Sequence, residues 1–133
     1  MASAAQRKSV ENVSEATAII TNPTHFAVAL KYIVGEPGAP EVVAMGRGNI
    51  AQEIINRGKE KNITVYRSPL LARALFFTSE IGKEILEKLY SAVAVALAYI
   101  YKIDKGELVD EPQIDIPEDL RFNENGKTIK DKD

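Results

Sequence analysis

The 133-residue sequence predicts a small α/β domain, in which three to four helices surround a small mixed sheet of about four strands and a disordered acidic C-terminal tail follows. Short runs rich in β-branched residues alternate with segments of helical periodicity through residue 103. Hydrophobic residues make up 45% and charged residues 27% of the chain, the balance of a globular protein. The length suits one domain.

Four apolar runs have the composition of strands: residues 16–21, 26–34, 41–45 and 63–67. Asn22-Pro23 ends the first run, and Gly35-Glu36-Pro37-Gly38 is a strong turn signal that ends the second. Only the turn of residues 22–25 separates the first two runs, which favours an antiparallel hairpin. The third and fourth runs flank a helix, which favours a right-handed parallel crossover, so the predicted sheet is mixed.

Three segments have the pattern of helices, and the polar segment before residue 16 suits a fourth. Ile50, Ile54 and Ile55 share one face ahead of Gly58, which predicts a helix of about three turns. Pro69 suits the first turn of a second helix. Residues 81–103 are expected to form the last helix, with a core-facing stripe at spacings of three and four: Leu86, Leu89, Val93, Leu97 and Ile100.

Composition and charge exclude several classes of function. The net charge of -2 argues against a nucleic-acid partner, because a protein that binds nucleic acid usually has a strongly basic face. The chain has no cysteine and one histidine, His25, so thiolate chemistry and a zinc site of the usual kind are not expected, and no cofactor or metal is predicted. The longest apolar stretch, residues 89–101, is shorter than the ~20 residues that a membrane-spanning helix needs. No signal peptide is visible.

Charge divides the chain into unequal parts. Residues 1–101 carry a net charge of +2 and residues 102–133 a net charge of -4, with proline, glycine and aperiodic apolar residues in the second part. We therefore expect a linker at residues 1–15, an α/β domain at residues 16–103 and a flexible acidic tail at residues 104–133. A short docking motif within the tail, between Ile114 and Phe122, is the alternative to a solvated tail.

The turn between the first two strands carries the most unusual chemistry in the chain. Asn22 precedes Pro23, whose substituted nitrogen cannot attack the asparagine side chain, so the common route to deamidation is closed. The remaining route is attack of the Asn22 side-chain nitrogen on its own backbone carbonyl, which forms a succinimide and breaks the bond to Pro23. Thr24 and His25 are close enough in sequence to assist proton movement or to hold the turn. On spacing alone, however, Asn-Pro is typical of an ordinary turn.

Four motifs in order make the chain resemble one family. These are Asn22-Pro23-Thr24-His25 with the run to Tyr32, residues 39–46 (Ala-Pro-Glu-Val-Val-Ala-Met-Gly), residues 69–76 (Pro-Leu-Leu-Ala-Arg-Ala-Leu-Phe) and residues 89–94 (Leu-Tyr-Ser-Ala-Val-Ala). Over residues 13–103 the sequence resembles the cytoplasmic domain of the FlhB/YscU family, the export-apparatus switch proteins of bacterial flagella and type III secretion systems. The flagellar branch is favoured. Phe26 stands where tyrosine is commoner, and the segment before the first strand lacks the family's usual basic character.

The resemblance implies a mechanism and a location. Such a domain lies at the cytoplasmic face of the bacterial inner membrane, attached to an N-terminal membrane domain that is absent from this chain. It cleaves itself once between the positions matching Asn22 and Pro23, which here leaves fragments 1–22 and 23–133, and it is not a turnover enzyme. Cleavage accompanies a change of export substrates from rod and hook proteins to filament proteins, which a hook-length ruler protein helps to trigger. Other export-apparatus components are further expected partners.

An apolar docking patch for export substrates is also implied by the resemblance. Its expected residues are Ala39, Pro40, Ala94 and Leu97, although Ala94 and Leu97 by themselves are equally typical of a helix core. The alternative function is therefore an uncleaved, soluble paralogue that acts as an export-substrate binding module.

Two other features have ordinary structural interpretations. Residues 46–49 (Gly-Arg-Gly-Asn) lack the spacing and the lysine of a phosphate-binding loop, so we expect Asn49 to cap the following helix. Glu84 and Lys88, spaced i and i+4, are expected to form a surface ion pair.

Overall fold

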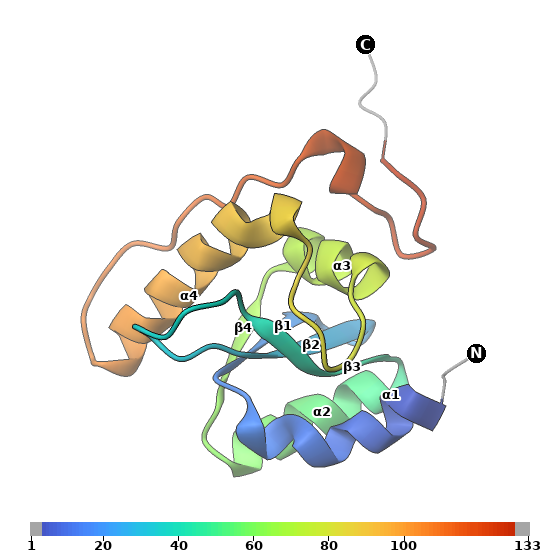
Figure 1. Ribbon diagram of the computed structural model, residues 1–133, viewed down its shortest axis with the longest axis horizontal. Helices are drawn as coiled ribbons and strands as arrows, with labels where there is room; N and C mark the ends of the chain where they lie inside the picture. The colour runs from blue at the N-terminus through green and yellow to red at the C-terminus, as the bar shows by residue number, and fades with distance from the viewer. Residues whose placement is uncertain (1–3, 130–133) are drawn as a thin grey trace.

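A four-stranded mixed sheet forms the centre of the molecule in the computed structural model, which describes residues 4–129 (Figure 1). The strands are β1 (Ala18–Asn22), β2 (Phe26–Lys31), β3 (Glu41–Arg47) and β4 (Thr64–Arg67), in the order β3-β2-β1-β4. β1 pairs antiparallel with β2 and parallel with β4, and β2 pairs antiparallel with β3. The predicted fold class, the mixed sheet and the hairpin are confirmed.

Helices cover both faces of this sheet (Figure 1). Helix α1 (Ala4–Ser9), the 3-10 helix Val10–Glu15 and α2 (Asn49–Glu60) lie on one face, whereas α3 (Pro69–Thr78) and α4 (Tyr90–Asp104) lie on the other. Because side chains alternate along a strand, β1 contributes to both cores: Ile19 packs with α2, and Ala18 and Ile20 pack with α3 and α4. All three are fully buried.

The last helix begins later than predicted. Residues 79–86 are not helical, and a 3-10 helix, Glu87–Leu89, leads into α4 at Tyr90. The preceding segment instead bonds to the edge of β3: the Gly82 amide donates to the Val42 carbonyl at 2.7 Å, and the Val42 amide donates to Lys83 at 2.9 Å. Leu86 is consequently 38% exposed, while Leu89, Val93 and Ile100 are buried as expected.

Two local predictions near helix ends are wrong. Helix α2 starts at Asn49 itself, and Gly48, with φ of 59°, holds the N-cap position without any side-chain cap. Glu84 lies off the helix and accepts the Ala39 amide at 3.3 Å, whereas Lys88 pairs with Asp119 at 2.9 Å. For Glu84 and Lys88, partners that are distant in sequence determine the contacts.

The segment expected to be a linker is part of the fold. In the 3-10 helix Val10–Glu15, Val10 and Val13 are buried against the α2 side of the sheet. The Asn12 side chain donates to the Val43 carbonyl at 3.1 Å, and the Met45 amide donates to the Ser9 hydroxyl at 3.3 Å. Residues 4–15 are therefore part of the hydrophobic core between the sheet and α2.

The expected tail also packs against the domain. Ile116 and Leu120 are 2% and 7% exposed within the α3–α4 core, and a 3-10 helix, Glu118–Leu120, carries the second of them. The Arg73 guanidinium donates to the Phe122 carbonyl at 2.6 Å. The prediction of a disordered tail is thus wrong for this stretch, because a few apolar residues without a regular period are enough to dock it. Residues 130–133 lie outside the described residues.

Candidate functional site

The Asn22–Pro23 bond lies in the turn that joins β1 to β2. Asn22 ends β1 and pairs with Phe26, the first residue of β2. The His25 amide donates to the Asn22 carbonyl at 2.9 Å and closes the turn. Thr24 has φ of 68°, a left-handed conformation that type II turns usually give to glycine or asparagine and that is strained for a β-branched residue. The turn therefore stores backbone strain next to the predicted cleavage point.

Asn22 is only 7% exposed, and its side-chain amide is a buried polar group. Its Nδ2 atom is buried and has no hydrogen-bond partner among residues 4–129. A buried amide nitrogen without a partner costs about 1–3 kcal/mol. The nitrogen that would attack the backbone carbonyl is thus not held by any competing hydrogen bond within the described chain.

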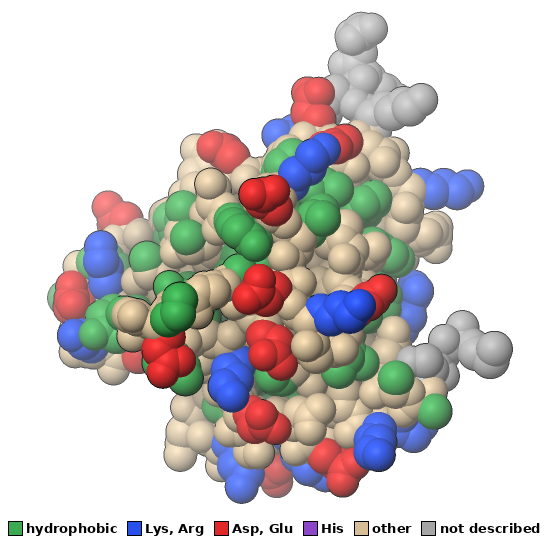
Figure 2. All heavy atoms as spheres, in the orientation of Figure 1, with side chains coloured by type: hydrophobic (Ala, Val, Ile, Leu, Met, Phe, Trp, Pro, Cys, Tyr) green, Lys and Arg blue, Asp and Glu red, His purple; other side chains and the backbone are tan. Residues whose placement is uncertain are grey.

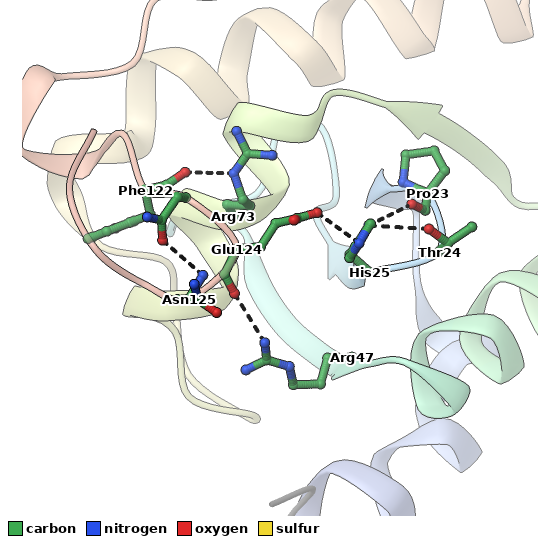
Figure 3. A network of polar contacts seen from close by, with 9 residues as sticks. Pro23, Thr24, His25, Arg47, Arg73, Phe122, Glu124 and Asn125 are labelled. Carbon is green, nitrogen blue, oxygen red and sulfur yellow. Dashed lines mark hydrogen bonds and ion pairs between the residues drawn. The ribbon is translucent and has the colours of Figure 1, made fainter. Parts of the chain in front are cut away.

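The imidazole of His25 bridges the turn and a distant part of the chain (Figure 3). Nδ1 lies 3.2 Å from both the Thr24 hydroxyl and the Pro23 carbonyl oxygen. Nε2 lies 2.8 Å from a carboxylate oxygen of Glu124, and both side chains are about half exposed. Because a carboxylate can only accept, Nε2–H donates a hydrogen bond to Glu124, and the ring is held from both sides.

Glu124 was not predicted as a site residue. It comes from the segment expected to be disordered, and its backbone carbonyl also accepts the Arg47 guanidinium at 3.1 Å. Nothing in the local sequence marks this glutamate among its acidic neighbours. Tertiary contacts of its segment, which include the burial of Ile116 and Leu120, bring it to the turn.

The four residues predicted for substrate docking line one apolar cavity of about 600 Å³, between α4 and the loop that follows β2. Tyr90, Ala94, Leu97, Ala98 and Tyr101 of α4 form one wall, and the opposite wall comes from Tyr32, Val34, Gly38, Ala39, Pro40 and Glu84. Figure 2 shows hydrophobic side chains on the face where this loop crosses α4. The hydrogen bond from Ala39 to Glu84 holds the loop in place.

The structure thus separates the predicted site residues into two places. Asn22, Pro23, Thr24 and His25 form the turn, while Ala39, Pro40, Ala94 and Leu97 form the cavity wall. Within residues 4–129, no helix has both the length and the apolar character to cross a bilayer.

Comparison with known proteins agrees with this architecture. The sequence profile described as "FlhB HrpN YscU SpaS Family" matches residues 1–100. The chain is 43% identical over 117 residues to the flagellar biosynthetic protein FlhB of Salmonella typhimurium, covering 88% of this chain and 30% of that protein. It is 49% identical over 96 residues to FlhB of Aquifex aeolicus, covering 72% of this chain and 27% of that protein. The chain therefore spans less than a third of the length of these relatives.

Solved structures agree as well. The crystal structure of the cytoplasmic domain of FlhB from Shewanella putrefaciens is similar with a TM-score of 0.78 and 37% identity, covering 89% of this chain and 96% of that one. A mutated EscU C-terminal domain is similar with a TM-score of 0.64 and 31% identity, covering 68% of this chain and 91% of that one. The resemblance inferred from the motifs is confirmed: the chain belongs to the FlhB/YscU family, and the part of the family that it matches is the cytoplasmic domain of the flagellar proteins.

Proposed function

We propose that this chain is the self-cleaving switch domain of a flagellar protein export apparatus and that it breaks its own backbone once, between Asn22 and Pro23. The observation that carries the proposal is the state of Asn22, whose buried Nδ2 has no partner among the described residues while its carbonyl accepts the His25 amide. The nucleophile is free, and the electrophile is held and polarised. Family membership supports the same function.

The proposed reaction is asparagine cyclisation. Nδ2 of Asn22 attacks the Asn22 carbonyl carbon, loses a proton and forms the new C–N bond of a five-membered ring. The carbonyl oxygen carries negative charge in the tetrahedral intermediate, where the His25 amide, 2.9 Å away in the ground state, is a ready donor. The bond to Pro23 then breaks as the prolyl nitrogen takes up a proton, leaving a succinimide at the end of fragment 1–22 and a free amine on fragment 23–133.

The turn favours this reaction in three further ways. Pro23 has no N–H, so its nitrogen cannot capture the Asn22 side chain in the competing deamidation. The left-handed conformation of Thr24 is strained by about 1–3 kcal/mol, and cleavage of the neighbouring bond releases that strain. Intramolecular attack gains most of its rate from held geometry, which a turn at the end of a paired strand supplies.

Intact mass under denaturing conditions tests the cleavage. The parent chain is expected to give two masses, ending at Asn22 and beginning at Pro23, whereas Asn22→Ala gives one full-length mass. Asn56→Ala, the same change on the outer face of α2, is the matched control and should cleave like the parent. A parent chain that keeps its full mass after long incubation would favour the alternative, an uncleaved export-substrate binding module.

The switch itself is tested on the full-length protein that contains this domain. We infer that this domain is attached to a membrane domain and lies at the cytoplasmic face of the bacterial inner membrane. We also infer that it contacts the hook-length ruler protein and other components of the export apparatus. Cells carrying Asn22→Ala should export rod and hook proteins but fail to change to filament proteins. Normal filament export by the uncleaved variant would make cleavage incidental to the switch.

The apolar cavity is the proposed docking site for an apolar segment of the export substrates. Its walls hold Ala39, Pro40, Ala94 and Leu97, with Glu84 as the one acidic side chain among its lining residues. Ala94→Asp should weaken the binding of a purified rod or hook protein by at least about tenfold, since burying an unpaired charge costs more than 1.4 kcal/mol. Val95→Asp, on the same helix but outside the cavity lining and already 40% exposed, is the control. Equal effects of both changes would contradict docking at the cavity.

A further inference from the structure

The C-terminal segment presents Glu124 to the Asn22–Pro23 turn from a loop that is closed by its own hydrogen bonds. The Asn123 side-chain oxygen accepts the amides of Asn125 at 2.8 Å and Lys127 at 3.0 Å, and Phe122 pairs with Thr128 across the loop. Glu124 thus lies in a tight turn that its neighbours close by hydrogen bonds.

Two anchors hold this loop against the domain. The centroids of the Phe122 and Phe77 rings lie 5.6 Å apart, and the backbone carbonyl of Phe122 accepts a hydrogen bond from the Arg73 guanidinium at 2.6 Å. On the other side, Arg47 donates to the Glu124 carbonyl and its guanidinium lies 4.9 Å from the centre of the Phe26 ring. Arg47 ends β3 and Phe26 begins β2, so the loop is tied to the strand ends that flank the turn (Figure 3).

We propose that Glu124 is a positioning residue for the cleavage turn and that it acts through His25. The inference rests on the proposed self-cleavage. The Glu124 carboxylate lies 2.8 Å from Nε2 of His25, while Nδ1 of the same ring faces the Pro23 carbonyl and the Thr24 hydroxyl. The imidazole therefore joins the C-terminal loop to the turn. The backbone amide of His25 is the donor to the Asn22 carbonyl. Fixing the ring restricts the residue that carries this donor and keeps the turn near the geometry of attack.

The rate of cleavage tests this role. The full chain is made in a cell-free reaction with a short labelling pulse, and the conversion to fragments is followed by denaturing electrophoresis and mass. Glu124→Gln should slow cleavage about three- to fivefold, the scale of an exposed ion pair. Asp119→Asn is the matched control, because it removes the same charge and another ion pair of the same segment, with Lys88, away from the turn. It should cleave at the parent rate.

A double-mutant cycle and one spectroscopic signal separate positioning from general stability. In a His25→Ala background, Glu124→Gln should cause no further slowing. His25 is the only histidine in the chain, so its ring signals in NMR spectra are unambiguous. In uncleaved Asn22→Ala protein, these signals should shift with Glu124→Gln and lose their cross-peaks to residue 124, but they should not respond to Asp119→Asn.

Each outcome decides between the two proposals. A parent chain that never cleaves overturns both the self-cleavage and the role of Glu124. Cleavage of the parent with an unchanged rate in Glu124→Gln overturns the positioning role alone. Equal slowing by Glu124→Gln and Asp119→Asn, or the same slowing with and without His25, also overturns it, because the effect would then come from docking of the segment.

Discussion

Asn22 and Thr24 each carry an unfavourable local energy that the surrounding hairpin maintains. The Asn22 amide nitrogen is buried without a partner among residues 4–129, and the Thr24 backbone is left-handed. Costs of this kind, about 1–3 kcal/mol each, persist only where neighbouring structure imposes them. Here β1 is paired on both sides, and the His25 carbonyl also accepts the Gly48 amide at 3.0 Å. The strained residues are the same ones that the proposed cleavage uses.

A second residue-scale constraint is the close approach of β3 to α2 at Gly46. A Cβ atom there would overlap the Ile50 side chain and lie 2.8 Å from its Cβ. Gly46→Ala should lower the free energy of unfolding by about 1–3 kcal/mol, measured by urea denaturation in the Asn22→Ala background. In Gly58→Ala the new Cβ overlaps only Cδ1, the terminal atom of the Ile19 side chain, and the change gains helix propensity, so it should cost less. An equal cost at both glycines would contradict this account.

At the scale of elements, the C-terminal segment contributes to the core. Leu120→Ala should lower the free energy of unfolding by about 2–4 kcal/mol, because the leucine is 7% exposed and leaves a cavity when truncated. Leu108→Ala is the matched control, since that side chain is fully exposed at 101%. Denaturation of both variants gives the comparison. Equal stability of Leu120→Ala and the parent would indicate that the segment is not docked in solution.

The start of the same segment contacts β4 through a pH-sensitive pair. The Tyr66 hydroxyl donates to Glu111 at 3.1 Å, and burial, followed by this hydrogen bond and the glutamate charge, raises the pKa of Tyr66 to about 12. The folded pKa lies above the unfolded value of about 10. The contribution to stability is therefore complete below pH 10 and is lost as the pH rises towards 12. Tyr66→Phe should remove this loss from alkaline unfolding curves, whereas exposed Tyr90→Phe should keep it.

At the scale of the whole molecule, the proposed cleavage does not separate the two fragments. Fragment 1–22 would contain β1, which lies between β2 and β4, and its buried residues belong to both cores: Val10, Val13, Ala18, Ile19 and Ile20. We expect the fragments to co-elute in native size-exclusion chromatography at the position of uncleaved Asn22→Ala protein. They should separate only in denaturant. Dissociation in native buffer would show that pairing of β1 is not enough to retain the fragment.

Most of the fold could be predicted because its signals are local. Strand composition, the Asn-Pro and Pro-Gly turns and the helical spacing around Ile54 and Leu75 depend on residues close in sequence. The start of α4 could not be predicted, because the segment 79–86 is compatible with a helix in its composition but forms hydrogen bonds with the edge of β3. Tertiary hydrogen bonds there outweigh a weak local preference.

The sequence by itself determined the α/β class, the hairpin whose turn contains the Asn22–Pro23 bond, and the motifs that identify the family. These follow from local chemistry and from the order of short segments. Only the tertiary structure decided that Asn22 is buried without a partner within the described chain, that the expected docking patch around Ala39 and Ala94 is a cavity, and that Glu124 reaches His25. Each of these depends on contacts between segments that are distant in sequence; the position of Glu124, for example, depends on a segment that docks through Ile116 and Leu120. Packing between distant segments leaves no periodic trace in a short, charged stretch of chain.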